Sequence, residues 1–168
     1  IIRSCIQYGP KAIETPDDYE ARANLMWNAS WAINGFLDMG KPVAWSVHRM
    51  EHELSAFYDI THGVGLAILT PNWMRYVLSE KTEHRFARYG MAVWGLDASL
   101  SPRVLAETAI QKTRDFFSSM GLPATLAEVG IGPEHFGEMA RKARTGGFDK
   151  TFVPLSAEDI VEIYRMSL

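Results

Sequence analysis

Helix start and stop signals recur along the chain and constrain its fold more than any other feature. Between residues 15 and 35, Thr15 is predicted to cap a helix, Pro16 to occupy its first position and Gly35 to end it. Apolar side chains recur in this segment at steps of three and four residues, the spacing of one helical face. They are Tyr19, Ala23, Met26, Trp27 and Trp31. We expect a helix whose apolar stripe is buried.

Three later segments repeat this combination of a cap or terminator with a helical spacing of apolar residues. They cover residues 80–97, where Gly95 is predicted to end the helix, and residues 101–123 and 154–168. In the second segment Ser101 caps and Pro102 follows it, and in the third Ser156 and Asp159 resemble a capping box.

No segment alternates apolar and polar residues between hairpin turns, and the chain has neither an internal repeat nor a low-complexity linker. The predicted fold class is therefore all-α, a helical bundle or array in a single domain over residues 1–168. Residues 144–154, which include Gly146 and Gly147, are the clearest predicted loop.

Composition and charge favour a globular protein that acts on small molecules. The chain has 168 residues, of which 47% are hydrophobic, and a formal net charge of -3, so neither disorder nor nucleic-acid binding is expected. No run of about 18 apolar residues could span a membrane. The lone Cys5 cannot form an internal disulfide, which suits the cytoplasm. The chain starts with Ile1 and has no signal-peptide layout, so we expect a segment cut from a longer protein.

Three of the five histidines lie within residues 46–65. His48 and His52 are four residues apart, so on a helix their side chains lie one above the other. His62 is expected in the first turn of a second helix, capped by Asp59 or Thr61. A helix, a tight turn and a second helix could bring all three imidazoles to one metal ion, whereas the alternative is a corner of hydrogen-bonded histidines.

The segment HRMEH, from His48 to His52, also matches H-x-x-E-H, the inverted zinc-protease arrangement in which Glu51 is the general base. That reading leaves His62 unexplained and needs an acidic ligand from elsewhere in the chain. The nominal candidates are Glu83, Glu107 and Glu128. A helical interaction domain without catalytic function is a third hypothesis.

The longer stretch from His48 to Met74 resembles the iron-containing, or group III, alcohol dehydrogenases, and most closely their NAD(P)H-dependent butanol dehydrogenase branch. Their pattern is H-x3-H, nine further residues and then H-G, followed by an apolar helix leading to proline. Here His48, His52, His62, Gly63 and Pro71 match it. The flanking segments are also similar, so the resemblance covers nearly the whole chain.

The resemblance implies the C-terminal, all-helical domain shared with dehydroquinate synthase-like enzymes, preceded by a dinucleotide-binding domain, in a homodimeric enzyme that interconverts primary alcohols and aldehydes. His48 and His62 match two of four ligands of a divalent metal, iron in the first place and zinc as the alternative. His52 matches a catalytic histidine in the cleft near the nicotinamide and is not usually a ligand. This replaces the picture of three imidazoles on one ion.

Two parts of the family pattern are missing from the chain. The other two ligands belong to an upstream Asp-x3-His element, and no aspartate here has a histidine four residues on. The glycine-rich phosphate-binding loop is also missing, so the residues that bind NAD(P)H are expected upstream. The chain should hold half of a metal site and, alone, bind metal weakly and reduce nothing.

The remaining candidates have smaller roles. His84 and His135 lie among charged residues and are predicted at the surface. Either Glu51 or Glu53 could orient His48 or His52 through its second ring nitrogen. Trp45 and Phe57 could line a substrate pocket, but are more simply explained as core.

Overall fold

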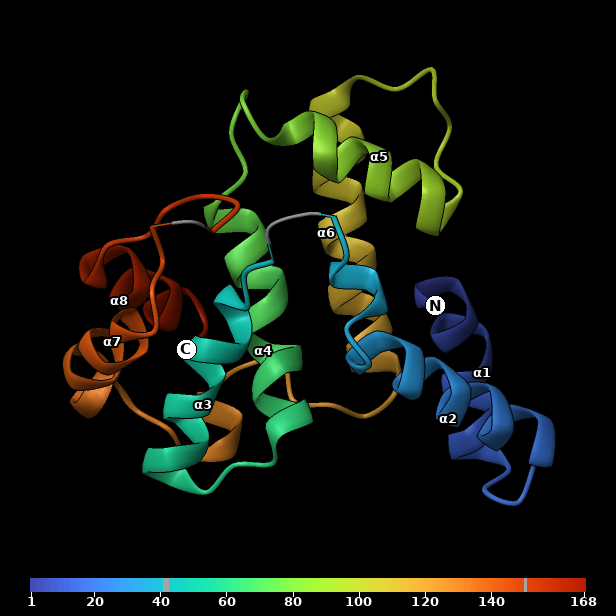
Figure 1. Cartoon of the computed structure of the whole chain (residues 1–168), viewed down its shortest axis with the longest axis horizontal. Helices are drawn as coiled ribbons and strands as arrows, with labels where there is room; N and C mark the ends of the chain where they lie inside the picture. Colours follow the sequence, from blue (N-terminus) through green and yellow to red (C-terminus); the bar gives the residue numbers. More distant parts are fainter. Residues whose placement is uncertain (41–42, 150) are drawn as a thin grey trace.

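The computed structural model describes residues 1–40, 43–149 and 151–168, and Figure 1 shows how they are arranged. These residues form eight α-helices and three short 3-10 helices, and none of them lies in a β-strand. The α-helices are α1 (Ile2–Glu14), α2 (Tyr19–Ile33), α3 (Ser46–Tyr58), α4 (His62–Tyr76), α5 (Glu83–Trp94), α6 (Pro102–Ser119), α7 (Phe136–Thr145) and α8 (Ala157–Met166). The 3-10 helices are η1 (Phe36–Asp38), η2 (Ala127–Val129) and η3 (Pro133–His135). The predicted all-α fold class is confirmed.

The main core forms where α3, α4, α7 and α8 pack together, on the left of Figure 1. Met50 and Leu54 of α3 are fully buried there, as are Ile160, Ile163 and Tyr164 of α8. The Tyr164 hydroxyl donates a hydrogen bond to the backbone carbonyl of Met50, 2.7 Å away, so the buried phenol has a partner. This hydrogen bond joins α8 to α3, the helix that carries His48 and His52.

A buried amide connects α4 to α6 and to the end of the chain. Asn72 on α4 is 2% exposed. Its side-chain nitrogen donates to the carbonyl of Ile68 and to the hydroxyl of Ser167, and its oxygen accepts from Arg114 on α6. Because an unpaired buried amide is costly, these partners restrict how the three elements can pack.

The predicted caps of the two later helices are confirmed. The Ser101 hydroxyl accepts from the backbone of Val104, with Pro102 as the first residue of α6. Ser156 and Asp159 form a complete capping box at the start of α8. Within the predicted segment 80–97, α5 extends from Glu83 to Trp94, and Gly95 ends it in a left-handed conformation (φ 66°) as predicted.

The prediction for the start of α2 was wrong. Asp18 caps this helix, its carboxylate accepting from the backbone of Ala21, and the turn between α1 and α2 contains Thr15 and Pro16. An aspartate three residues downstream offers the same capping chemistry, so the local pattern alone did not separate the two starts.

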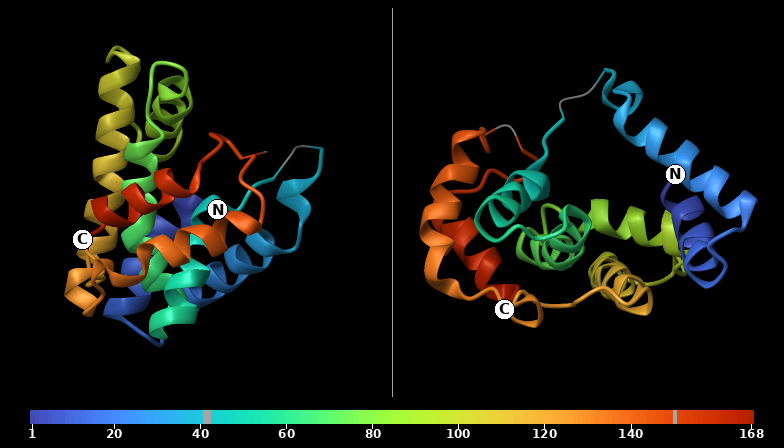
Figure 2. Two further views of the ribbon diagram at one scale, coloured as in Figure 1. Left: turned by 90° about the vertical axis from the view of Figure 1, so that its left-hand side faces the viewer. Right: turned by 90° about the horizontal axis from the view of Figure 1, so that it is seen from below.

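The prediction that the apolar stripe of α2 is buried is also wrong. Tyr19, Met26 and Trp27 are 85%, 74% and 64% exposed, and the fully buried residue of this helix is Ala21. The helix packs against α1 at one edge of the molecule, as the right-hand view of Figure 2 shows. Large apolar residues occur around its circumference, which is typical of a helix with neighbours on several sides.

The remaining differences concern boundaries. The structure continues α7 to Thr145, into the loop predicted for residues 144–154; residue 150 of that loop lies outside the described residues. The sequence assigned no bounds to α1 or α7. Nowhere in the described ranges does a helix combine the length and apolar character needed to cross a membrane.

We expect Gly90→Ala to destabilise the protein. Gly90 lies where α5 packs on α6, and a Cβ atom there would lie 2.9 Å from Leu96 Cδ1 and 3.0 Å from the carbonyl oxygen of Leu105. Because a helix backbone cannot move away cheaply, the free energy of unfolding should fall by about 1–3 kcal/mol. Thermal unfolding of the full-length protein measures this. In the control Gly137→Ala the added atom meets only Arg141 Nη1, at 3.7 Å, and an unchanged or higher unfolding temperature is expected.

The carboxyl group of Asp159 leads to a prediction of how the free energy of unfolding depends on pH in the acid range. Burial raises the pKa of its carboxyl, but hydrogen bonds from Tyr76 and Ser156 outweigh burial and lower it. The stabilisation is therefore present above the unfolded-state pKa of about 3.9 and is lost as the pH falls through the lower, folded-state pKa. Asp159→Asn should lower the free energy of unfolding by about 1 kcal/mol at neutral pH, and this difference should disappear in acid. A constant difference between variant and wild type as the pH is lowered would contradict the assignment.

Candidate metal centre

The two histidines of α3 project from the same side of that helix. His48 lies in its first turn and His52 one turn later, with ring centroids 6.3 Å apart. The indole of Trp45, the residue before α3, packs edge-on against the His48 ring at 4.7 Å. The helix predicted for this segment is therefore present, and its aromatic neighbour holds the first imidazole.

The turn after α3 brings in the third histidine. Asp59 ends α3 in a left-handed conformation (φ 52°) and Thr61 precedes α4 without forming a side-chain cap. His62 is the first residue of α4, and its ring centroid lies 5.3 Å from those of both His48 and His52. The prediction that a helix corner brings the three imidazoles together is confirmed, although Asp59 ends the first helix rather than capping the second.

Glu51 lies behind this cluster and is fully buried. One carboxylate oxygen pairs with Nδ1 of His62, and the other lies 2.6 Å from the hydroxyl of Ser55. The sequence had suggested that Glu51 or Glu53 would orient His48 or His52. In the structure Glu51 instead pairs with His62, the first residue of α4.

The donor atoms match a site for a divalent transition metal. Ligand atoms of Glu51, His52 and His62 lie within 4.8 Å of one another, and the ring of His48 is in contact distance of that of His62. Burial lowers the pKa of His48, and the neighbouring His62 and His52 lower it further, which favours the neutral imidazole that metal binding requires. Imidazole nitrogens are common ligands of both iron and zinc.

A hollow of about 800 Å³ opens beside His48. Its lining is largely apolar and aromatic, with Trp45, Trp73 and Phe152, and includes the polar side chains of Thr70 and Arg85. Trp45 thus lines a cavity next to the histidines, as one reading of the sequence allowed. Phe57 does not line it, and packs near His135 and under the ammonium group of Lys142 instead.

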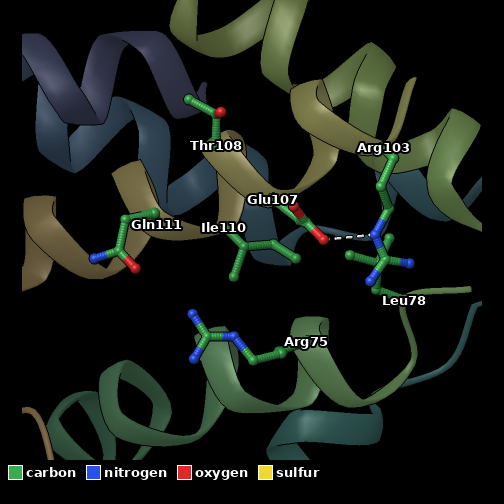
Figure 3. Close-up of a pocket in the computed structure, with 7 residues that line it drawn as sticks. All are labelled: Arg75, Leu78, Arg103, Glu107, Thr108, Ile110 and Gln111. Atoms are coloured by element: carbon green, nitrogen blue, oxygen red, sulfur yellow. Dashed lines mark hydrogen bonds and ion pairs between the residues drawn. The ribbon is translucent and has the colours of Figure 1, made fainter. Parts of the chain in front are cut away.

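A second hollow, of about 470 Å³, lies between α4 and α6 and has no histidine in its lining. Figure 3 shows Arg75 reaching from α4 toward α6, with Glu107 paired to Arg103 at 2.6 Å on the opposite wall. Glu107 is thus engaged in an ion pair away from the histidine cluster.

The protease hypothesis finds no support among the described residues. Glu128 is exposed and accepts hydrogen bonds from Ala124 and Thr125, and Glu83 lies in the first turn of α5. Within the described ranges, the group of potential metal ligands that the fold assembles is Glu51, His52 and His62. The general base that such a protease needs, Glu51, is turned away from solvent and paired with His62.

The sequence analysis missed two residues of this region, Ser55 and Gly65. An ideal Cβ atom on Gly65 would lie 2.7 Å from Cγ of Glu51, so the glycine leaves room for the buried carboxylate. A glycine inside an apolar helix is a sign of close approach by another element, and that signal could have identified it. The surface positions predicted for His84 and His135 are confirmed.

Comparison with known proteins identifies the family of this chain. The family model for the C-terminal part of the Fe-containing alcohol dehydrogenases matches residues 1–168. NADH-dependent butanol dehydrogenase A of Clostridium acetobutylicum is 54% identical over 99% of this chain and 43% of its own length. The NADPH-dependent aldehyde reductase YqhD of Escherichia coli is 33% identical over 88% of this chain and 38% of its own length.

Solved structures give the same result for the fold. The crystal structure of NADH-dependent butanol dehydrogenase A from Thermotoga maritima superposes with a TM-score of 0.88 at 34% identity, covering 98% of this chain and 43% of that one. The chain therefore spans less than half the length of the relatives that it matches. With a family model that matches from its first residue to its last, the chain belongs to the Fe-containing alcohol dehydrogenase family, of which it is the C-terminal, all-helical part.

Proposed function

We propose that this chain is the metal-contributing C-terminal domain of an NAD(P)H-dependent alcohol dehydrogenase that interconverts primary alcohols, of the size of butanol, and their aldehydes. The observation that carries the proposal is the convergence of three imidazoles at the α3–α4 corner. The names of the relatives, butanol dehydrogenases and an aldehyde reductase, supply the substrate class.

We assign His48 and His62 as ligands of one divalent metal, iron in the first place and zinc as the alternative. When bound, the metal would polarise the carbonyl of the aldehyde or lower the pKa of the alcohol. His52 lies one turn after His48 on α3, is exposed, and would pass the alcohol proton to solvent. Its exposed ring suits a group that exchanges protons with water.

The upstream part of the full-length protein would complete the site. Metal sites of this kind need further ligands. Hydride transfer also needs a bound nicotinamide, and the described residues contain no strand from which a glycine-rich strand-to-helix turn could hold one. Both the exposed histidine face and the apolar surface of α2, with Met26 and Trp27, support a covering partner. We propose a dinucleotide-binding domain of the same polypeptide in this place, in a cytoplasmic, homodimeric enzyme.

The first test uses the full-length protein and three substitutions, His48→Ala, His52→Ala and His62→Ala. Metal content is measured together with butyraldehyde reduction followed through NADH or NADPH. His48→Ala and His62→Ala should lose the metal and more than about 100-fold in kcat/KM, equivalent to about 2.7 kcal/mol of transition-state stabilisation. His52→Ala should retain the metal and lose about 100-fold or more in kcat.

His84→Ala and His135→Ala are the matched controls, since both side chains are exposed and lie outside the cluster. They should change neither readout. If all three cluster variants keep metal and activity, the histidines are structural and the chain is an interaction domain. Peptide hydrolysis by the zinc-loaded protein, without aldehyde reduction, would favour the protease instead.

A further inference from the structure

Glu51 is the one charged side chain among the buried residues of the described ranges. A carboxylate without solvent costs several kcal/mol unless its charge and lone pairs find partners. Such a residue on the helix that carries His48 and His52 therefore needs an explanation. A helix of this amphipathic kind would be more stable with an apolar side chain at the same place.

Both carboxylate oxygens of Glu51 have partners within the chain. One pairs with His62 Nδ1, and the other lies 2.6 Å from the hydroxyl of Ser55, one turn further along α3. The Ser55 hydroxyl also lies 3.1 Å from the carbonyl oxygen of Ile60 in the corner. The contacts thus connect α3, the turn and the first residue of α4.

The opposite helix is shaped to accept this carboxylate. Gly65 lies one turn after His62, and an ideal Cβ atom there would approach Cγ of Glu51 to 2.7 Å and Oε1 to 2.8 Å. Real Cβ atoms are not found at such distances from a neighbouring atom, so any larger residue would displace the carboxylate. A glycine inside a helix destabilises it by about 1 kcal/mol relative to alanine. At Gly65 this cost is offset only because the Glu51 side chain occupies the space that a Cβ atom would fill.

From these contacts we infer that Glu51 is a positioning residue for His62, with Gly65 as the residue that makes room for it. Accepting the Nδ1–H of His62 fixes the ring tautomer and its rotation. The Nε2 lone pair is then left free, and it is available to a metal shared with His48. This role rests on the proposed function, because it concerns one of the assigned ligands. Glu51 belongs to the group whose ligand atoms lie within 4.8 Å of one another. In this arrangement it orients a ligand and is not one itself, because its two oxygens already have His62 and Ser55 as partners.

The direct test compares Glu51→Gln and Glu51→Ala with the wild type in the full-length protein. The readouts are the affinity for Zn²⁺, measured by competition with a chelator, and the visible absorption spectrum of the Co²⁺-loaded protein. Loss of a carboxylate that orients a ligating histidine weakens metal binding by about 10- to 100-fold. We expect that loss in Glu51→Ala, a smaller one in Glu51→Gln, and Co²⁺ bands at wild-type positions because the ligands are unchanged.

Glu53→Gln is the matched control. Glu53 lies two residues further along the same helix, is partly exposed and has no hydrogen bond or ion pair with a histidine among the described contacts. The substitution removes the same charge from the same helix. It should leave the Zn²⁺ affinity within about twofold of the wild type, less than the change that removal of an orienting carboxylate causes.

A double-variant cycle separates positioning from simple packing. Gly65→Ala should displace the carboxylate, lowering both the unfolding temperature of the metal-free protein and the Zn²⁺ affinity. Adding Glu51→Ala to Gly65→Ala removes the clash, so the unfolding temperature should recover toward that of Glu51→Ala alone. The Zn²⁺ affinity should stay low, because nothing then orients His62. Gly137→Ala controls for the added methyl group, because a Cβ atom on this helix glycine would make only an ordinary van der Waals contact, 3.7 Å from Arg141 Nη1.

Three results would overturn the inference. One is wild-type Zn²⁺ affinity in both Glu51 variants, and another is recovery of affinity together with stability in the double variant. The third is a Co²⁺ spectrum with shifted bands in Glu51→Gln, which would make Glu51 a ligand. His62→Ala separates this inference from the proposed function. If the His62→Ala protein keeps the metal, the proposed function fails. If it loses the metal while both Glu51 variants bind Zn²⁺ with wild-type affinity, only the positioning role is rejected.

Discussion

The close approach of α3 and α4 at Gly65 is the constraint on which the site depends. Because this glycine has no side chain, the carboxylate of Glu51 can lie between the two helices and reach His62. The buried charge then requires its partners to stay in place. The α3–α4 corner is therefore held by a polar contact as well as by apolar packing, and the three imidazoles come together on its outer side.

The rest of the core supports this corner from the opposite side. Tyr164 of α8 donates to the carbonyl of Met50, the residue next to Glu51, and Asn72 joins α4 to α6 and to Ser167. These are buried hydrogen bonds whose loss leaves unsatisfied groups, so they select one relative placement of the helices. The histidine face, in contrast, is open, with His52 and His62 exposed. A rigid support behind histidines that face an open side is what the proposed metal site, completed by a further domain, would require.

The chain matches the C-terminal part of the Fe-containing alcohol dehydrogenase family, and it carries large apolar side chains that are exposed to solvent. The chain spans about 43% of the butanol dehydrogenases that it matches. Large apolar side chains gathered on an exposed face, as on α2, are uncommon on the surface of a monomeric soluble protein. They fit the proposal that a further domain of the same polypeptide covers this surface. The prediction for the α2 stripe was wrong because an apolar helix pattern indicates burial without identifying the covering element.

Local chemistry in the sequence determined the helices, most of their caps and the grouping of the histidines. The capping box at Ser156, the cap at Ser101 and the spacing of His48 and His52 depend on neighbours within one or two turns, and such interactions can be inferred without a fold. The tertiary structure decided which residues meet across helices. That Glu51 pairs with His62, and not with His48 or His52, follows from how α3 rotates against α4. The same packing decided that Gly65 had to be a glycine and that Glu107 pairs with Arg103 away from the site. These contacts join residues whose relative placement is set by the whole core, which no local pattern encodes.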